Sequence, residues 1–255
     1  MRNIQAEIQE ELDRIEKTRD VEIIHAIESG SRAWGFASPD SDYDVRFVYA
    51  HKRDWYLSVF AKKDVIERPC DEVLDISGWD LKKACGLFKK SNGALLEWIQ
   101  SPIVYRQVPE KYELLKELAN CCFRVAPLFF HYRAMFKSSF MKIQETGEAK
   151  LKTYLYALRP AFCCDWLLKR RTMPPVEFFK LAEFIFQASE NNEFEQELHV
   201  LLNRKGNAKE SETMPRSPVL DANLEKMLDQ FENYPPLVDK GPDSQDIEQL
   251  FRKFF

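Results

Sequence analysis

The sequence lacks the features of a membrane or exported protein. Its apolar runs are far shorter than the roughly 20 residues needed to cross a bilayer. Residues 2–13 are mostly polar and contain no apolar run of the signal-peptide type. The six cysteines include no C-x-x-C pair and no spacing typical of a zinc site, so we expect free thiols. The sequence therefore predicts a cytoplasmic protein without a membrane partner.

The chain also lacks an excess of basic residues. It has 37 Lys and Arg against 41 Asp and Glu, a formal net charge of -4, which excludes a general nucleic-acid coat protein that binds by neutralising phosphates. A local basic groove is still compatible with this balance. The absence of a G-x-x-x-x-G-K-S/T loop argues against an ATPase of the P-loop kind. The sequence contains no R-G-G motif, zinc finger or RNP-like strand. It therefore shows no recognised module that would select a particular nucleic acid.

The 255 residues, 45% of them hydrophobic, suffice for one large domain or two modest ones. Strand and helix patterns alternate up to residue 92, whereas helical periodicity dominates afterwards. The predicted fold class is therefore α/β (α+β), with a mixed sheet and helices in a catalytic domain over residues 1–92. A helical domain that completes the substrate cleft is predicted over residues 93–255.

The most informative stretch runs from Gly30 to Asp44. A strand-like segment at 21–27 leads into Gly30-Ser31, a turn whose backbone N–H groups and small hydroxyl can bind an anionic phosphate. A second strand begins at Asp42, and side chains alternate along a strand. Asp42, Asp44 and Arg46 are therefore predicted to share one face.

Two carboxylates on one strand face repel each other unless a cation lies between them. Mg²⁺ prefers oxygen ligands and is commonly held by one or two carboxylates together with nucleotide phosphates. The turn and the two acids together therefore predict a site for a metal-bound nucleoside triphosphate. A further acid, Asp75, is isolated in the same way on a strand at 72–80 whose opposite face is apolar.

Four segments carry a resemblance to a known family: G-S-R-A-W-G-F-A-S-P-D-S-D-Y-D-V-R-F at 30–47, V-L-D-I-S-G-W-D-L at 73–81, L-L-E-W-I-Q-S-P-I-V-Y at 95–105 and L-K-T-Y-L-Y-A-L-R-P at 151–160. The first resembles the signature of the DNA polymerase β-type nucleotidyltransferase superfamily. The set resembles its RNA-repair-pathway branch of bacterial and phage proteins. The resemblance spans roughly the first 160 residues.

The resemblance implies that Asp42 and Asp44 bind two Mg²⁺ ions, with Mn²⁺ as an alternative, and that a third carboxylate holds one metal and helps deprotonate the attacking hydroxyl. Asp75 is our candidate for that third acid. Asp71 and Asp80 are rivals, although Asp80 also fits a helix N-cap. The phosphates of the triphosphate would contact Gly30 and Ser31. Arg32 would either join them or lie on the surface.

A third group of residues lies in the helical part. Lys152, Tyr156 and Arg159 are spaced by four and three residues and therefore share one helix face. Positive charge beside a hydroxylated aromatic ring suits contact with a triphosphate and a nucleobase. The alternative is an ordinary exposed stripe with Tyr156 half buried.

The leading hypothesis is a Mg²⁺-dependent nucleotidyltransferase, of EC 2.7.7 type, that moves a nucleoside monophosphate from ATP or another NTP to an acceptor hydroxyl. The resemblance makes an RNA or tRNA 3′ end the first acceptor to test, in RNA repair or tRNA modification. One alternative is a protein acceptor, as in AMPylating nucleotidyltransferases of toxin-antitoxin type. Another is an inactive nucleotide-binding module. The preferred base, template use and oligomeric state stay open.

Overall fold

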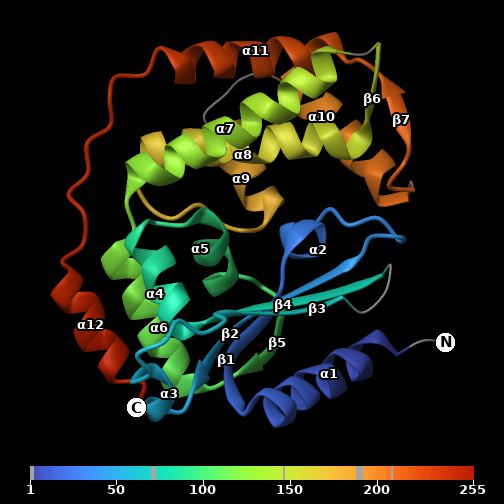
Figure 1. Cartoon of the computed structure of the whole chain (residues 1–255). Coiled ribbons are helices and arrows are strands. Elements are labelled where there is room, and N and C mark those ends of the chain that lie inside the picture. The colour runs from blue at the N-terminus through green and yellow to red at the C-terminus, as the bar shows by residue number, and fades with distance from the viewer. Residues whose placement is uncertain (1–2, 70–72, 146, 188–191, 208) are drawn as a thin grey trace. The chain divides into compact units, whose positions relative to one another are not determined.

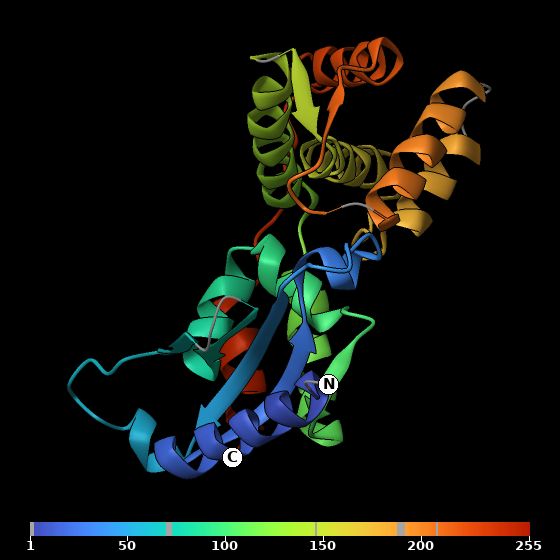
Figure 2. The same cartoon turned by 90° about the vertical axis from the view of Figure 1, so that its right-hand side faces the viewer.

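A computed structural model describes residues 3–69, 73–145, 147–187, 192–207 and 209–255. The chain divides into two compact units, each described by itself below (Figures 1 and 2). The sheet unit comprises the chain up to Ala33, Asp42–Phe123 and Lys240–Phe255. The helical unit comprises Trp34–Ser41 and Arg124–Asp239.

The sheet unit is built on a five-stranded sheet in the order β3-β4-β2-β1-β5. Its strands are β1 (Val21–Glu28), β2 (Tyr43–His51), β3 (Val65–Pro69), β4 (Leu74–Asp80) and β5 (Val104–Gln107). Strand β2 pairs antiparallel with β1 and parallel with β4. The prediction of a mixed sheet with helices is therefore confirmed.

One face of this sheet is covered by helix α1 (Ile4–Arg19), as Figure 2 shows. The helix contributes buried Ile8, Leu12 and Ile15, which pack with Val45 and Phe47 of β2. Their spacing of three and four residues gives the helix a single apolar stripe. Val45 and Phe47 alternate with Asp44 and Arg46 along β2, so the acidic side of β2 faces away from α1.

Helices α4 (Leu81–Lys89), α5 (Gly93–Ile99) and α6 (Pro109–Cys122) pack on the opposite side of the sheet from α1 (Figures 1 and 2). The C-terminal helix α12 (Ser244–Arg252) packs against α4 and α6. The short helix α3 (Arg53–Tyr56) follows β2, and the short helix α2 (Gly30–Trp34) follows β1. All of these helices except the last residue of α2 lie within the sheet unit.

The two units divide the chain differently from the predicted boundary at residue 92. Helices α5 and α6 belong to the sheet unit because their side chains complete its core: Trp98 stacks on Trp79 of β4, with ring centroids 4.0 Å apart, and Tyr112 lies 4.5 Å from His25 of β1. Helical periodicity shows that a segment has an apolar face but does not show what that face packs against. Helical periodicity dominates this part of the sequence, and β5, a four-residue strand at the sheet edge, is one of the short strands found there.

The helical unit is formed by α7 (Val125–Gln144), α8 (Leu151–Arg170), α9 (Phe178–Gln187), α10 (Asn192–Asn207) and α11 (Pro218–Glu232). Helices α7 and α8 pack along each other, and α10 and α11 pack on α8. Strand β7 (Thr213–Pro215) lies in the polar segment between α10 and α11. That strand pairs with β6 (Glu148–Lys150), a non-local pairing that local polarity does not reveal.

No helix within the described residues is both long and apolar enough to cross a membrane. The thiols of Cys85, Cys121, Cys122, Cys163 and Cys164 are free, as the spacing predicts. The sixth cysteine, Cys70, lies outside the described residues.

Candidate active site

Two of the three predicted catalytic acids are direct neighbours across a strand pair. Asp44 of β2 and Asp75 of β4 are register partners in the parallel ladder, so their side chains emerge from the same face of the sheet. Asp42 is exposed and lies immediately before the first residue of β2. The pairing of Asp44 with Asp75 agrees with the strand-face argument that favoured Asp75.

The predicted phosphate-binding turn is held against the same acids. Gly30 has a positive φ of 65°, a conformation that glycine adopts without steric cost. A Cβ at this position would lie 2.6 Å from Asp44 Oδ2, so the Asp44 carboxylate rests directly on the glycine backbone. The N–H of Ser29 donates to the Asp44 carbonyl at 2.8 Å. The turn and the first acid therefore form one rigid arrangement.

Arg32 and Ser31 follow Gly30 in α2. The Arg32 Nε donates to the carbonyl of Asp42 at 2.9 Å, and its guanidinium lies over the Tyr43 ring, 3.7 Å from the centroid. These contacts fix the backbone at the start of β2. Arg32 therefore organises the segment that carries Asp42 and Asp44, a structural contribution that the sequence did not show.

Glu28, the last residue of β1, accepts a hydrogen bond from the backbone of Asp44. It was not among the predicted site residues. It is fully buried. Its Oε1 accepts the Asp44 N–H at 2.9 Å, and its Oε2 accepts the Tyr105 hydroxyl at 2.5 Å. Burial raises the pKa of Glu28, against the opposing effect of the hydrogen bond from Tyr105. An acid at the end of a largely apolar strand was the signal available in the sequence.

Arg46 lies between the paired acids. Its Nη2 donates to Asp44 Oδ1 at 3.0 Å and to Asp75 Oδ2 at 2.7 Å. The predicted common face of Asp44 and Arg46 is thus present, because the Arg46 guanidinium donates to the Asp44 carboxylate on the same strand. The sequence argument placed Arg46 on this face but gave it no role.

The two other candidates for the third carboxylate are Asp80 and Asp71. Asp80 is fully buried and caps α4, accepting the Lys82 N–H at 2.8 Å and the Tyr56 hydroxyl at 2.8 Å. It pairs in register with Tyr49, at the other end of β2 from Asp44. Asp71 lies outside the described residues.

The chemistry of the acid cluster fits a hard divalent cation. Asp44 and Asp75 offer partly exposed carboxylate oxygens, the ligand type that Mg²⁺ prefers, and a cationic group already lies between them. Within the described residues, no three Asp, Glu, His or Cys side chains are drawn together as a ligand cluster. A metal ion bound to both acids would take the place of Arg46.

The second group of predicted nucleotide-binding residues belongs to the helical unit. Tyr156 and Arg159 of α8 both contact Trp34: the rings of Tyr156 and Trp34 are 5.4 Å apart, and the Arg159 guanidinium lies 4.4 Å from the Trp34 centroid. Arg159 is buried, and its Nε and Nη2 donate to the Val176 carbonyl. Tyr156 is 39% exposed. The predicted common face is present for this pair, but its arginine points into the unit.

Lys152 is partly exposed and forms an ion pair with Glu210, Nζ to Oε2 at 2.7 Å. Ser41 donates to the other oxygen of Glu210 at 2.9 Å. Although burial alone would raise it, the hydrogen bonds from Lys152 and Ser41 hold the pKa of Glu210 below its ordinary value. Lys205, which is buried, contacts the Ser38 hydroxyl. Polar contacts of Ser38 and Ser41 therefore join residues 34–41 to the rest of the helical unit.

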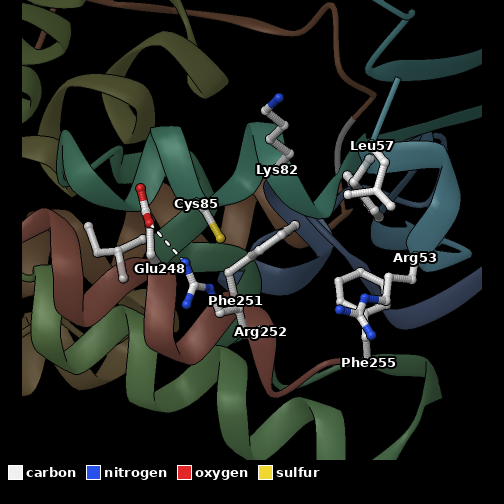
Figure 3. Close-up of a pocket in the computed structure, with 10 residues that line it drawn as sticks. Arg53, Leu57, Lys82, Cys85, Glu248, Phe251, Arg252 and Phe255 are labelled. Carbon is white, nitrogen blue, oxygen red and sulfur yellow. Dashed lines mark ion pairs between the residues drawn. The ribbon is translucent and has the colours of Figure 1, made fainter. Parts of the chain in front are cut away.

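A pocket of about 690 Å³ lies elsewhere in the sheet unit, between α3, α4 and α12 (Figure 3). Arg53, Lys82 and Arg252 are among the residues that line it, and the Arg252 guanidinium pairs with Glu248 (Figure 3). Tyr56, which also lines the pocket, donates to Asp80. Asp80 lies five residues beyond Asp75 on β4, so the two acids are about 16 Å apart along the strand. None of the predicted site residues lines this pocket, so it is distinct from the acid cluster.

Comparison with known proteins shows the family of this chain. Residues 4–253 match the RNA repair pathway DNA polymerase beta family, RlaP. The chain belongs to this family. Membership over nearly the whole chain confirms the resemblance carried by the four sequence segments, and it makes this RlaP-family chain a polymerase β-like nucleotidyltransferase.

Two further proteins are similar to this RlaP-family chain. The uncharacterized protein YcgL of Bacillus subtilis (strain 168) is 41% identical over 222 residues, which cover 87% of this chain and 84% of YcgL. A solved structure, the nucleotidyltransferase-like protein from Exiguobacterium sibiricum 255-15, aligns with a TM-score of 0.34 at 11% identity. That alignment covers 82% of this chain and 69% of the other.

Proposed function

We propose that this protein is a Mg²⁺-dependent nucleotidyltransferase that transfers a nucleoside monophosphate from an NTP to a hydroxyl at an RNA 3′ end. The observation that carries the proposal is the in-register pair of Asp44 and Asp75 beside the Gly30 turn. Carboxylates face a position that suits a cation, and the turn next to them offers backbone N–H groups to phosphate.

The reaction joins the acceptor oxygen to the α-phosphorus and breaks the bond between that phosphorus and the bridging oxygen to the β-phosphate. Pyrophosphate leaves with the electron pair of that bond. Asp42, Asp44 and Asp75 would hold the divalent cations, which when bound supply charge neutralisation and activation of the hydroxyl. Asp75, the more exposed carboxylate of the pair, would accept the proton of the attacking hydroxyl. No covalent enzyme intermediate is needed.

The remaining residues position the substrates. Gly30 and Ser31 would donate to the triphosphate, and Glu28 and Arg32 hold the segment that carries the acids. Lys152 and Tyr156 would contact phosphate and base. Arg159 would position Tyr156 through their shared contacts with Trp34. Alternatively, it would break its hydrogen bonds to the Val176 carbonyl and contact the nucleotide.

The test is transfer of label from α-³²P-labelled NTPs, one base at a time, to tRNA and small-RNA pools in the presence of Mg²⁺ or Mn²⁺. We expect label on RNA 3′ ends. Periodate treatment of the RNA before the reaction should prevent this labelling, and Asp44→Asn should give no label. Asp64→Asn is the matched control, because Asp64 is a partly exposed acid that pairs with Lys83 outside the acid cluster.

Two outcomes would contradict parts of the proposal. Nucleotide binding without label on any RNA would reject an RNA acceptor. Label on a protein band in a lysate, lost with Asp44→Asn, would keep the chemistry and replace RNA by a protein hydroxyl.

A further inference from the structure

Arg46 is held by four acceptors from two strands. Besides Asp44 and Asp75, its Nη1 donates to the carbonyl of Val45 at 3.0 Å and to the carbonyl of Asp75 at 3.3 Å. Its side chain is 19% exposed, whereas those of Asp44 and Asp75 are 37% and 54% exposed. The Arg46 side chain is therefore less exposed than either of the two carboxylate side chains it joins.

The backbone explains why the cation lies at this point. Arg46 follows Asp44 by two residues and so returns to the same face of β2, while the register of β2 with β4 brings Asp75 alongside. Two carboxylates this close repel each other without a positive partner. A single guanidinium supplies one positive charge for two negative charges, and the cluster retains an attraction for a further cation.

We propose that Arg46 competes with the divalent cation for Asp44 and Asp75, and that an incoming triphosphate releases this competition by accepting the guanidinium. The inference rests on the proposed function, because it needs a metal-bound triphosphate as the ligand. Arg46 is thus a positioning residue: it holds the two carboxylates together in the nucleotide-free protein and exchanges them for phosphate oxygens when nucleotide binds.

The chemistry of the guanidinium makes phosphate the suitable new partner. A metal ion that binds both acids leaves Arg46 without its two charged acceptors, and a partly buried guanidinium without a charged partner is costly. The planar fork of arginine matches the oxygens of a phosphate group as well as those of a carboxylate. A metal-bound triphosphate brings the replacement cation and the replacement anion together. Metal and nucleotide binding are therefore coupled, and each strengthens the other.

The test measures Mn²⁺ binding directly, by the loss of the free-Mn²⁺ electron paramagnetic resonance signal, without any turnover. In the absence of nucleotide, Arg46→Gln is expected to bind Mn²⁺ roughly tenfold more tightly than the wild type, because a competing charge has been removed from partly exposed carboxylates. A non-hydrolysable NTP analogue should increase Mn²⁺ affinity in both proteins, but by a smaller factor in Arg46→Gln.

Arg106→Gln is the matched control. Arg106 also bridges two acids, Glu16 at 2.8 Å and Asp13 at 2.5 Å, and its side chain is 20% exposed, but it lies on β5. Its substitution should leave Mn²⁺ binding unchanged. Should Arg46→Gln fail to fold, as judged by circular dichroism, Arg46→Lys is used instead. The lysine keeps one charge but loses the fork, and it should bind Mn²⁺ more tightly than the wild type by a smaller factor.

The outcomes separate this inference from the proposed function. Equal or weaker Mn²⁺ binding by a folded Arg46 variant, with normal binding by the wild type in the presence of nucleotide, overturns the role of Arg46 alone. Absence of Mn²⁺ binding in every protein, with and without nucleotide, overturns the metal site and with it the proposed function.

Discussion

The carboxylate of Asp44 rests on the backbone of Gly30, so closely that a Cβ on the glycine would lie 2.6 Å from Asp44 Oδ2. The positive φ of Gly30 excludes most side chains on conformational grounds as well. Two independent constraints therefore act at one residue, and both concern the position of the first acid of the candidate site.

Gly30→Ala is expected to destabilise the protein by about 1–2 kcal/mol and to reduce transfer activity, because Asp44 must move away from the new methyl group. Urea unfolding and the labelled-NTP assay measure the two effects. Gly86→Ala is the matched control: Gly86 is exposed in α4, and a Cβ there meets no atom within 4 Å. The control should stabilise slightly, since alanine favours a helix. Equal behaviour of the two variants would refute the close-contact explanation.

Replacement of the site acids should separate chemistry from folding. Asp42→Asn, Asp44→Asn and Asp75→Asn are each expected to lower transfer by more than about 100-fold, because each removes a metal ligand. Their unfolding midpoints should stay near the wild-type value. Asp80→Asn is the comparison, because asparagine also caps a helix and Asp80 lies away from the cluster. A larger loss of activity in Asp80→Asn than in Asp75→Asn would move the third-acid assignment.

Lys152→Ala tests the proposed contact between Lys152 and the triphosphate. We expect the KM for NTP to rise roughly tenfold with little change in kcat, the effect of losing one charged hydrogen bond to phosphate. Lys150→Ala, two residues earlier and exposed, should leave KM unchanged. An unchanged KM in Lys152→Ala would mean that this lysine serves only its ion pair with Glu210.

His25 predicts how the stability of the sheet unit depends on pH. Its ring is buried, lies at a tilt against the Tyr112 ring and contacts the Trp98 carbonyl at 3.3 Å. Burial lowers the pKa of His25 from 6.5 to about 4, which outweighs the hydrogen bond to Trp98. Between these values the unfolded chain binds a proton that the folded chain does not, so stability falls as the pH is lowered from 6.5 to 4, by about 3 kcal/mol in total.

His25→Gln should lose this contribution, giving a flatter dependence of the urea midpoint on pH between 4 and 6.5. His199→Gln is the control, because the His199 side chain is 61% exposed. A wild-type curve that is already flat in this range would contradict the buried neutral state of His25.

Much of the fold follows from local patterns. The apolar stripe of Ile8, Leu12 and Ile15 accounts for α1, and the alternation after Asp42 predicted the common face of Asp44 and Arg46 on β2. Asp80 was correctly considered as a helix cap. The helical division was less successful, because α5, α6 and α12 carry the same kind of periodicity as the helices of the other unit and yet pack on the sheet.

By itself the sequence determined the turn at Gly30, the common face of Asp44 and Arg46, and the family, since these depend on the identity and spacing of neighbouring residues. Only the tertiary structure decided that Asp75 pairs with Asp44, that Glu28 supports Asp44 from behind, and that residues 34–41 belong with the helical unit. The physical reason is that strand register and burial are set by packing between segments far apart in the chain. Local periodicity fixes which way a side chain points but not which partner it meets.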